Sequence, residues 1–114
     1  MTINQAIRAT GALLAITVLP AILGCAPPTD YDTAALASGD PEVGAAIYAF
    51  ECASCHGVNG EGSAAGTPLV GEVATMTDDK IWWVIAYGAD GMPSYPELTD
   101  DDVGDLIAFM RATF

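Results

Sequence analysis

The chain has 114 residues, which is enough for one small domain. It carries 15 acidic residues against three lysines and arginines, so its formal net charge at pH 7 is −12. That charge opposes binding to nucleic acid and favours either a basic protein partner or simple solubility. With three cysteines and one histidine, no closed zinc site can form from separated Cys and His pairs without carboxylate ligands.

The first 24 residues are typical of an export signal. Arg8 precedes an apolar run over residues 9–23, which Thr and Pro interrupt, whereas a spanning helix needs about 20 predominantly apolar residues. The run ends in Leu23-Gly24-Cys25, similar to the bacterial lipobox, in which the cysteine is lipidated and becomes the mature N-terminus. Lipidation of Cys25 would account for the odd third cysteine. An uncleaved anchor helix and plain secretion are the alternatives.

Residues 25–39 contain paired prolines and scattered small polar residues, which predicts an extended, mobile tether. At roughly 3.3 Å per residue, such a tether would reach about 45 Å from its anchor. Cleavage before Cys25 would leave Lys80 and Arg111 against all 15 acidic residues, a net charge of −13.

A helix is predicted from Asp40, a suitable N-cap, into the central motif of the chain. Gly44 is unfavourable inside a helix, which indicates that another backbone approaches closely there. The helix leads to a C-x-x-C-H run at Cys52, Cys55 and His56. Two thiols one helical turn apart, followed by an imidazole, are the spacing of covalent c-type haem attachment. A redox dithiol or disulfide is the alternative, although no strand pattern surrounds the motif.

The rest of the chain predicts two more helices and two loops. Glycines mark residues 57–71 as a loop without regular structure. Thr77 is the expected N-cap of a helix that Gly88 ends, and its nearly continuous apolar residues predict burial on more than one side. After a loop rich in glycine and proline, Thr99 is the expected N-cap of the closing helix.

The single histidine makes His56 the proximal ligand of an attached haem, so the sixth position falls to Met, a weaker ligand or none. Met1 leaves with the signal, Met76 fits a hydrophobic staple, and Met110 lies on the apolar face of the last helix. Met92 stands in a loop between Gly and Pro, and it is the predicted axial ligand. Gap filling is the alternative role for Met92. His and Met ligation suits outer-sphere electron transfer.

The region from residue 39 to residue 114 resembles a small monohaem class I cytochrome c. The resemblance rests on the haem motif and on Gly91-Met92-Pro93, with weaker support from scattered glycines, Leu and aromatic residues. It implies an all-α fold with three to four helices around one covalent haem c. It also implies that the first and last helices touch, through Gly44 and Tyr48 on one and Leu106 and Phe109 on the other.

The same resemblance implies further haem contacts. In the family, a proline carbonyl of a Gly-Pro-Leu loop accepts a hydrogen bond from the proximal imidazole, which implies Pro68, although Thr67 intervenes after Gly66. Trp82 and Trp83 fall in the family's haem-packing helix. One of them could bond a propionate through its indole, with ordinary core packing as the alternative.

These observations predict a signal peptide over 1–24, a lipidated tether over 25–39 and a cytochrome c domain over 40–114. The expected function is a single-electron carrier rather than an enzyme, lipid-anchored on the periplasmic or other extracytoplasmic side of a membrane. Since the lysine ring of many soluble members is missing, a redox partner with a basic docking patch is expected. The alternatives are a haem subunit fixed in a larger oxidoreductase and a haem enzyme or gas sensor with an open sixth position.

Overall fold

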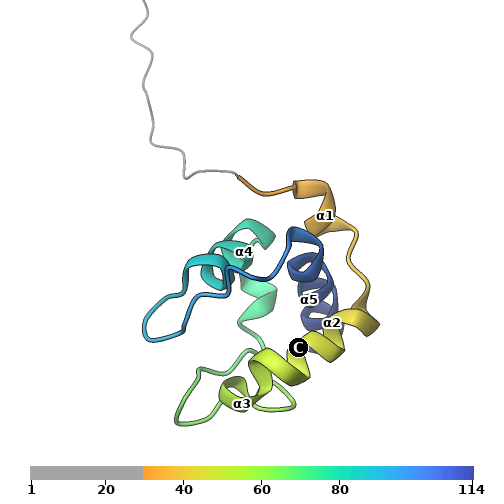
Figure 1. Ribbon diagram of the computed structural model, residues 1–114. Helices are drawn as coiled ribbons and strands as arrows, with labels where there is room; N and C mark the ends of the chain where they lie inside the picture. Colours follow the sequence, from red (N-terminus) through yellow and green to blue (C-terminus); the bar gives the residue numbers. More distant parts are fainter. Residues whose placement is uncertain (1–29) are drawn as a thin grey trace, which may run out of the picture.

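The computed structural model describes residues 30–114, which form a helical domain without strands (Figure 1). The signal segment, Cys25 and the start of the expected tether lie outside these residues. No helix in the described range is both long and apolar enough to cross a membrane. The elements are α1 (Thr33–Ala37), α2 (Pro41–Ile47), the π-helix η1 (Tyr48–Cys52), α3 (Ala53–His56), the 3-10 turn η2 (Val73–Thr75), α4 (Asp78–Tyr87) and α5 (Asp100–Thr113).

Helices α2 and α5 pack closely, and Figure 1 shows them lying against each other on one side of the domain. A Cβ atom added at Gly44 would collide with the carbonyl oxygen of Asp105, so the two backbones touch there. Farther along, the rings of Tyr48 and Phe109 lie 5.3 Å apart between centroids, and Leu106 is fully buried. The predicted contact between the first and last helices of the cytochrome domain, and the all-α fold, are confirmed.

Helix α1 is a correction to the expected tether, because it lies within residues 25–39. The Asp32 carboxylate caps it by accepting from the Ala34 amide at 2.8 Å, and Leu36 is only 4% exposed. The helix packs on α5, where a Cβ atom at Gly104 would collide with the Ala35 carbonyl oxygen. Local capping and burial of one leucine therefore outweigh the small polar composition that predicts an extended chain.

Helix α4 begins and ends where expected. The Thr77 side chain accepts from the Lys80 amide, and Gly88 closes the helix with φ of 77°. Its burial differs from the prediction, because Ile81, Trp82 and Ile85 enter the core while Trp83 and Tyr87 are 38% and 51% exposed. Although its sequence is almost continuously apolar, α4 therefore buries only one face.

Helix α5 begins with a reciprocal capping box. Thr99 accepts from the Asp102 amide, and the Asp102 carboxylate accepts from the Thr99 amide at 2.8 Å. Near its other end, the Arg111 guanidinium donates to the carbonyl oxygens of Val73 and Met76 and to the carboxylate of Asp78. Arg111 therefore fixes the turn between η2 and α4 against the last helix.

Candidate functional site

The two motif cysteines lie where the helical register changes. Residues 48–52 form a π-turn, closed by the Ala53 amide donating to the Tyr48 carbonyl oxygen five residues earlier. The four-residue helix α3 then carries Cys55 and His56. Both Cys52 and Cys55 are free thiols of intermediate exposure. Widened turns of this kind are frequent at functional sites, and this one sets the direction in which the motif leaves α2.

His56 is oriented by a backbone carbonyl. Its Nδ1 atom lies 2.7 Å from the carbonyl oxygen of Thr67. Because a carbonyl can only accept, Nδ1 carries the proton and the lone pair of Nε2 is left for a metal. Metal-binding histidines are usually held in this way, which fixes the ring and raises its basicity.

The resemblance predicts the Pro68 carbonyl as the partner of His56, and that prediction is wrong. The carbonyl that meets the imidazole belongs to Thr67, one residue earlier. The Pro68 ring packs against Gly62, where an added Cβ atom would lie 2.7 Å from the Pro68 nitrogen. Since the ring is seated on that turn, the peptide that precedes Pro68 faces His56.

The loop after the motif folds back onto the end of α3, in agreement with the absence of regular structure predicted for 57–71. The Gly62 amide donates to the His56 carbonyl oxygen at 2.7 Å, and the Ser63 hydroxyl donates to the Cys55 carbonyl oxygen at 2.7 Å. A Cβ atom at Gly66 would lie 2.7 Å from that same Cys55 oxygen. The loop therefore supplies the hydrogen bonds that the helix end leaves unmade.

Tyr48 connects the π-turn to the residue that follows His56. Its side chain is 2% exposed, and its hydroxyl donates to the Gly57 carbonyl oxygen at 2.7 Å. Burial is the main cause that raises the pKa of Tyr48 to about 12, with smaller electrostatic effects from Cys52 and Glu61. The hydroxyl is therefore protonated, and able to donate, at any physiological pH.

The environment of Cys52 disfavours the redox-dithiol alternative. Burial, with smaller effects from the charges of Glu51 and Cys55, raises the pKa of the Cys52 thiol to about 11. Redox-active cysteines instead have lowered pKa values, because the thiolate is the reacting form.

Met92 closes a tight turn beyond α4. The amides and carbonyls of Ala89 and Met92 bond to each other, at 2.7 and 3.3 Å, around Asp90 and Gly91. These two central residues have φ of 45° and 91°, as a type I′ turn requires. Met92 is of intermediate exposure and packs against the core. The turn fixes its backbone, while its role as an iron ligand stays a prediction.

The two tryptophans have different environments. Trp82 is buried, stacks on Tyr31 at 4.5 Å between ring centroids, and donates its indole N–H to Asp100 at 2.8 Å. Core packing is thus confirmed for Trp82. It is wrong for Trp83, which is partly exposed beneath the Lys80 ammonium. The propionate role stays a prediction, and at Trp82 it would have to displace Asp100.

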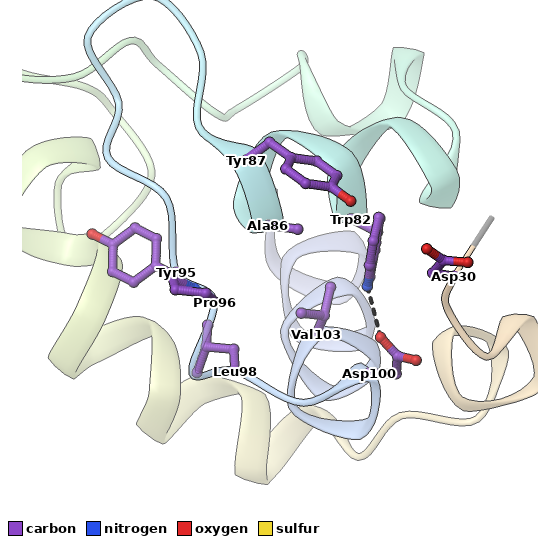
Figure 2. Close-up of a pocket in the computed structure, with 9 residues that line it drawn as sticks. All are labelled: Asp30, Trp82, Ala86, Tyr87, Tyr95, Pro96, Leu98, Asp100 and Val103. Atoms are coloured by element: carbon purple, nitrogen blue, oxygen red, sulfur yellow. Dashed lines mark hydrogen bonds between the residues drawn. The ribbon is translucent and has the colours of Figure 1, made fainter. Parts of the chain in front are cut away.

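A pocket of about 310 Å³ lies beside α4, residues 95–98 and the start of α5 (Figure 2). None of Cys52, Cys55, His56 and Met92 lines this pocket, so it is separate from the attachment residues. Its lining includes Trp82, Tyr87, Tyr95, Leu98 and Asp100.

The donor set fits covalent haem. Cys52 and Cys55 offer two free thiols at one-turn spacing, and the hydrogen bond at Nδ1 leaves Nε2 of His56 for iron. Among the described residues, no cluster of three or more Cys, His, Asp or Glu side chains offers a competing metal site. When bound, the haem supplies reversible one-electron exchange.

Two contacts at the site were missed by sequence reasoning. The first contact is between His56 and the Thr67 carbonyl oxygen, and the extra residue between Gly66 and Pro68 was the available signal for it. The second contact, from the Tyr95 hydroxyl to the Glu51 carbonyl oxygen at 3.2 Å, joins residues 44 positions apart. No local pattern could indicate it.

Comparison with known proteins agrees with the fold and the motif. The family model described as "Cytochrome C oxidase, cbb3-type, subunit III" matches residues 39–110. Among solved structures, the chain is similar to "KustC0563 c-type cytochrome", with a TM-score of 0.53 and 24% identity over 61% of this chain and 95% of that one. An identity this low shows the fold alone. The search of curated proteins gave no significant match.

Proposed function

Because this chain belongs to the c-type cytochrome family described as cbb3-type oxidase subunit III, whose domains carry covalent haem c, we propose that it is a single-electron carrier rather than an enzyme. In this proposal Cys52 and Cys55 hold the haem, His56 is the proximal ligand and Met92 is the sixth ligand. The observation that carries it is the hydrogen bond from His56 Nδ1 to the Thr67 carbonyl oxygen, which leaves Nε2 for iron.

The protein's part in electron transfer is to hold two ligands still. The Thr67 carbonyl fixes the plane of the His56 ring, and the loop bound to the end of α3 limits movement of the helix that carries it. Met92 is placed on a closed turn. Ligation by His and Met fills both axial positions and suits transfer without bond formation to a partner.

The anchoring proposal is lipidation of Cys25 after removal of residues 1–24, on the extracytoplasmic side of a membrane. Cytochrome c domains are generally exported, which supports removal of a signal. Each acyl methylene buried contributes about 0.8 kcal/mol, and stable anchoring usually takes more than one chain. Because Tyr31 stacks on Trp82 and α1 packs on α5, the proposed linker ends before Tyr31 rather than at residue 39. At roughly 3.3 Å per residue, residues 25–30 would give a reach of about 20 Å.

The proposed partner is a redox protein with a basic docking patch. All 15 acidic residues lie in the described range, where only Lys80 and Arg111 oppose them. Arg111 is already bonded to Asp78, and the Lys80 ammonium lies 5.3 Å from the Trp83 ring centroid. A strongly negative domain attracts a positive surface over about 8–10 Å at physiological salt.

The family description favours a second candidate, in which the chain is a haem subunit fixed in a larger oxidoreductase. Membrane extraction distinguishes the two. A free carrier would be recovered alone in mild detergent, whereas a fixed subunit would co-purify with its catalytic chains in constant proportion.

The first test is the absorption spectrum of the holoprotein, made in a host that attaches c-type haem. We expect a low-spin spectrum with the weak sulfur-to-iron band in the ferric form and no reaction of the ferrous form with carbon monoxide. Met92→Ala should abolish the band and open the site to carbon monoxide, whereas Met76→Leu should keep the wild-type spectrum. A wild type that binds carbon monoxide readily would instead support the enzyme or gas-sensor alternative.

A further inference from the structure

We propose that Tyr95 is a positioning residue, whose hydroxyl latches the loop carrying Met92 onto the haem-attachment segment. The inference rests on the proposed function, because it takes Met92 as the sixth ligand. Its basis is the hydrogen bond from the Tyr95 hydroxyl to the Glu51 carbonyl oxygen at 3.2 Å, directly before Cys52.

The donor is held firmly from its own side. The Tyr95 amide donates to the Ile85 carbonyl oxygen of α4 at 2.9 Å, and the Leu98 amide donates to the Tyr95 carbonyl oxygen at 3.3 Å. Figure 2 shows the Tyr95 ring directed away from Trp82 and Tyr87, with its hydroxyl toward the yellow-green helices. The backbone of Tyr95 therefore belongs to the α4 side of the domain, while its hydroxyl reaches the attachment side.

The acceptor lies in the π-turn of residues 48–52. In a π-turn the helix changes from four-residue to five-residue hydrogen bonds, and such turns are frequent at functional sites. The Ala53 amide marks this change by bonding to the Tyr48 carbonyl oxygen. The Glu51 carbonyl oxygen accepts from Tyr95 within the same turn. The hydrogen bond from Tyr95 therefore holds the residue directly before Cys52, the first haem cysteine.

The bond between Tyr95 and Glu51 spans the two sides of the site. Within residues 30–114, it is the one hydrogen bond that joins the loop of residues 88–98 to residues 48–57. Met92 precedes Tyr95 by three residues and is itself fixed in the turn with Ala89. Removing the hydroxyl would leave that turn intact but would free the loop to move away from the attachment segment as a unit.

The experiment uses Tyr95→Phe in the holoprotein and titrates the ferric form with imidazole. External imidazole must displace Met92, so its apparent affinity rises with the population in which the loop has moved away. Loss of one hydrogen bond of ordinary strength should raise that affinity about three- to tenfold, while the sulfur-to-iron band stays visible without imidazole. Tyr87→Phe is the matched control, because its hydroxyl makes no hydrogen bond to the described residues and its ring is half exposed.

A second titration separates positioning from a general loosening of the domain. In a Met92→Ala background there is no sixth ligand to hold, so adding Tyr95→Phe should leave imidazole affinity unchanged. An equal rise in both backgrounds would overturn the latch, as would wild-type affinity in Tyr95→Phe alone. With either of these two results, a sulfur-to-iron band in the wild type would still support Met92 ligation and the electron-carrier proposal. A wild type without the band would overturn Met92 ligation and the latch together.

Discussion

The Nδ1 atom of His56 lies 2.7 Å from the carbonyl oxygen of Thr67, although the two residues belong to different segments of the site. His56 ends α3, whereas Thr67 lies in the loop that folds back over that helix. The basicity of the proposed proximal ligand therefore depends on how closely this loop is seated. Gly66 controls that seating, because it lies against the Cys55 carbonyl oxygen.

Gly66→Ala should weaken the hold on His56. The added Cβ atom would lie 2.7 Å from the Cys55 carbonyl oxygen, so the loop must shift. Overpacking of this kind costs about 1–3 kcal/mol in the free energy of unfolding. Movement of the Thr67 carbonyl should also change the reduction potential of the holoprotein. Denaturant unfolding measures the change in the free energy of unfolding, and redox titration measures the change in the reduction potential. The control is Ala64→Ser, at an exposed position of the same loop. An unchanged potential would mean that the Thr67 contact does not tune the haem.

Tyr48→Phe should destabilise the domain because it removes a hydroxyl that donates a hydrogen bond. The hydroxyl donates to the Gly57 carbonyl oxygen at 2.7 Å from a side chain that is 2% exposed. Removing it leaves a carbonyl without its partner, which costs about 1–3 kcal/mol. Denaturant unfolding of the holoprotein measures the loss, and Tyr87→Phe, at a half-exposed ring, should change stability by much less. Equal losses in the two variants would show that the Gly57 bond contributes nothing specific.

The ionisation of Tyr48 should make the free energy of unfolding depend on pH in the alkaline range. The pKa of Tyr48 rises from 10.0 to about 12 in the folded protein, mainly through burial. Folding therefore favours the neutral phenol, and this contribution is fully present below pH 10 and is lost as pH rises toward 12. The wild type should lose more stability than Tyr48→Phe over that interval, as measured by unfolding at a series of pH values. Parallel pH profiles for the two proteins would contradict the prediction.

Features that depend on neighbours in the sequence could be predicted, and those that depend on distant contacts could not. The caps at Thr77 and Thr99 and the haem motif are each defined within five residues. The bond from Tyr95 to Glu51 joins residues 44 positions apart, and helix α1 has only five residues with no apolar period. Its formation depends on a tertiary contact of Leu36, which composition does not reveal.

Gly44→Ala should separate the two main helices. Its Cβ atom would collide with the Asp105 carbonyl oxygen and lie 2.9 Å from Cβ of Phe109, so α2 and α5 must move apart. The expected loss is about 3 kcal/mol, the upper part of the range for overpacking, because the obstructing atoms are backbone. The control is Ala46→Gly at an exposed position of α2, which should cost only about 1 kcal/mol through helix propensity. If Gly44→Ala were as stable as the wild type, the close contact of the helices would be wrong.

Leu36→Ala tests whether α1 belongs to the folded domain or to the tether. Leu36 is 4% exposed among core residues, and truncation of a buried leucine costs about 2–5 kcal/mol. A mobile tether would tolerate the change without effect on the free energy of unfolding. Ala37→Ser, at the exposed end of the same helix, provides the control. Limited proteolysis gives a second readout, because loosening α1 should expose new cleavage sites between residues 32 and 40 and lengthen the linker to the proposed anchor. Wild-type stability and cleavage in Leu36→Ala would restore the longer tether.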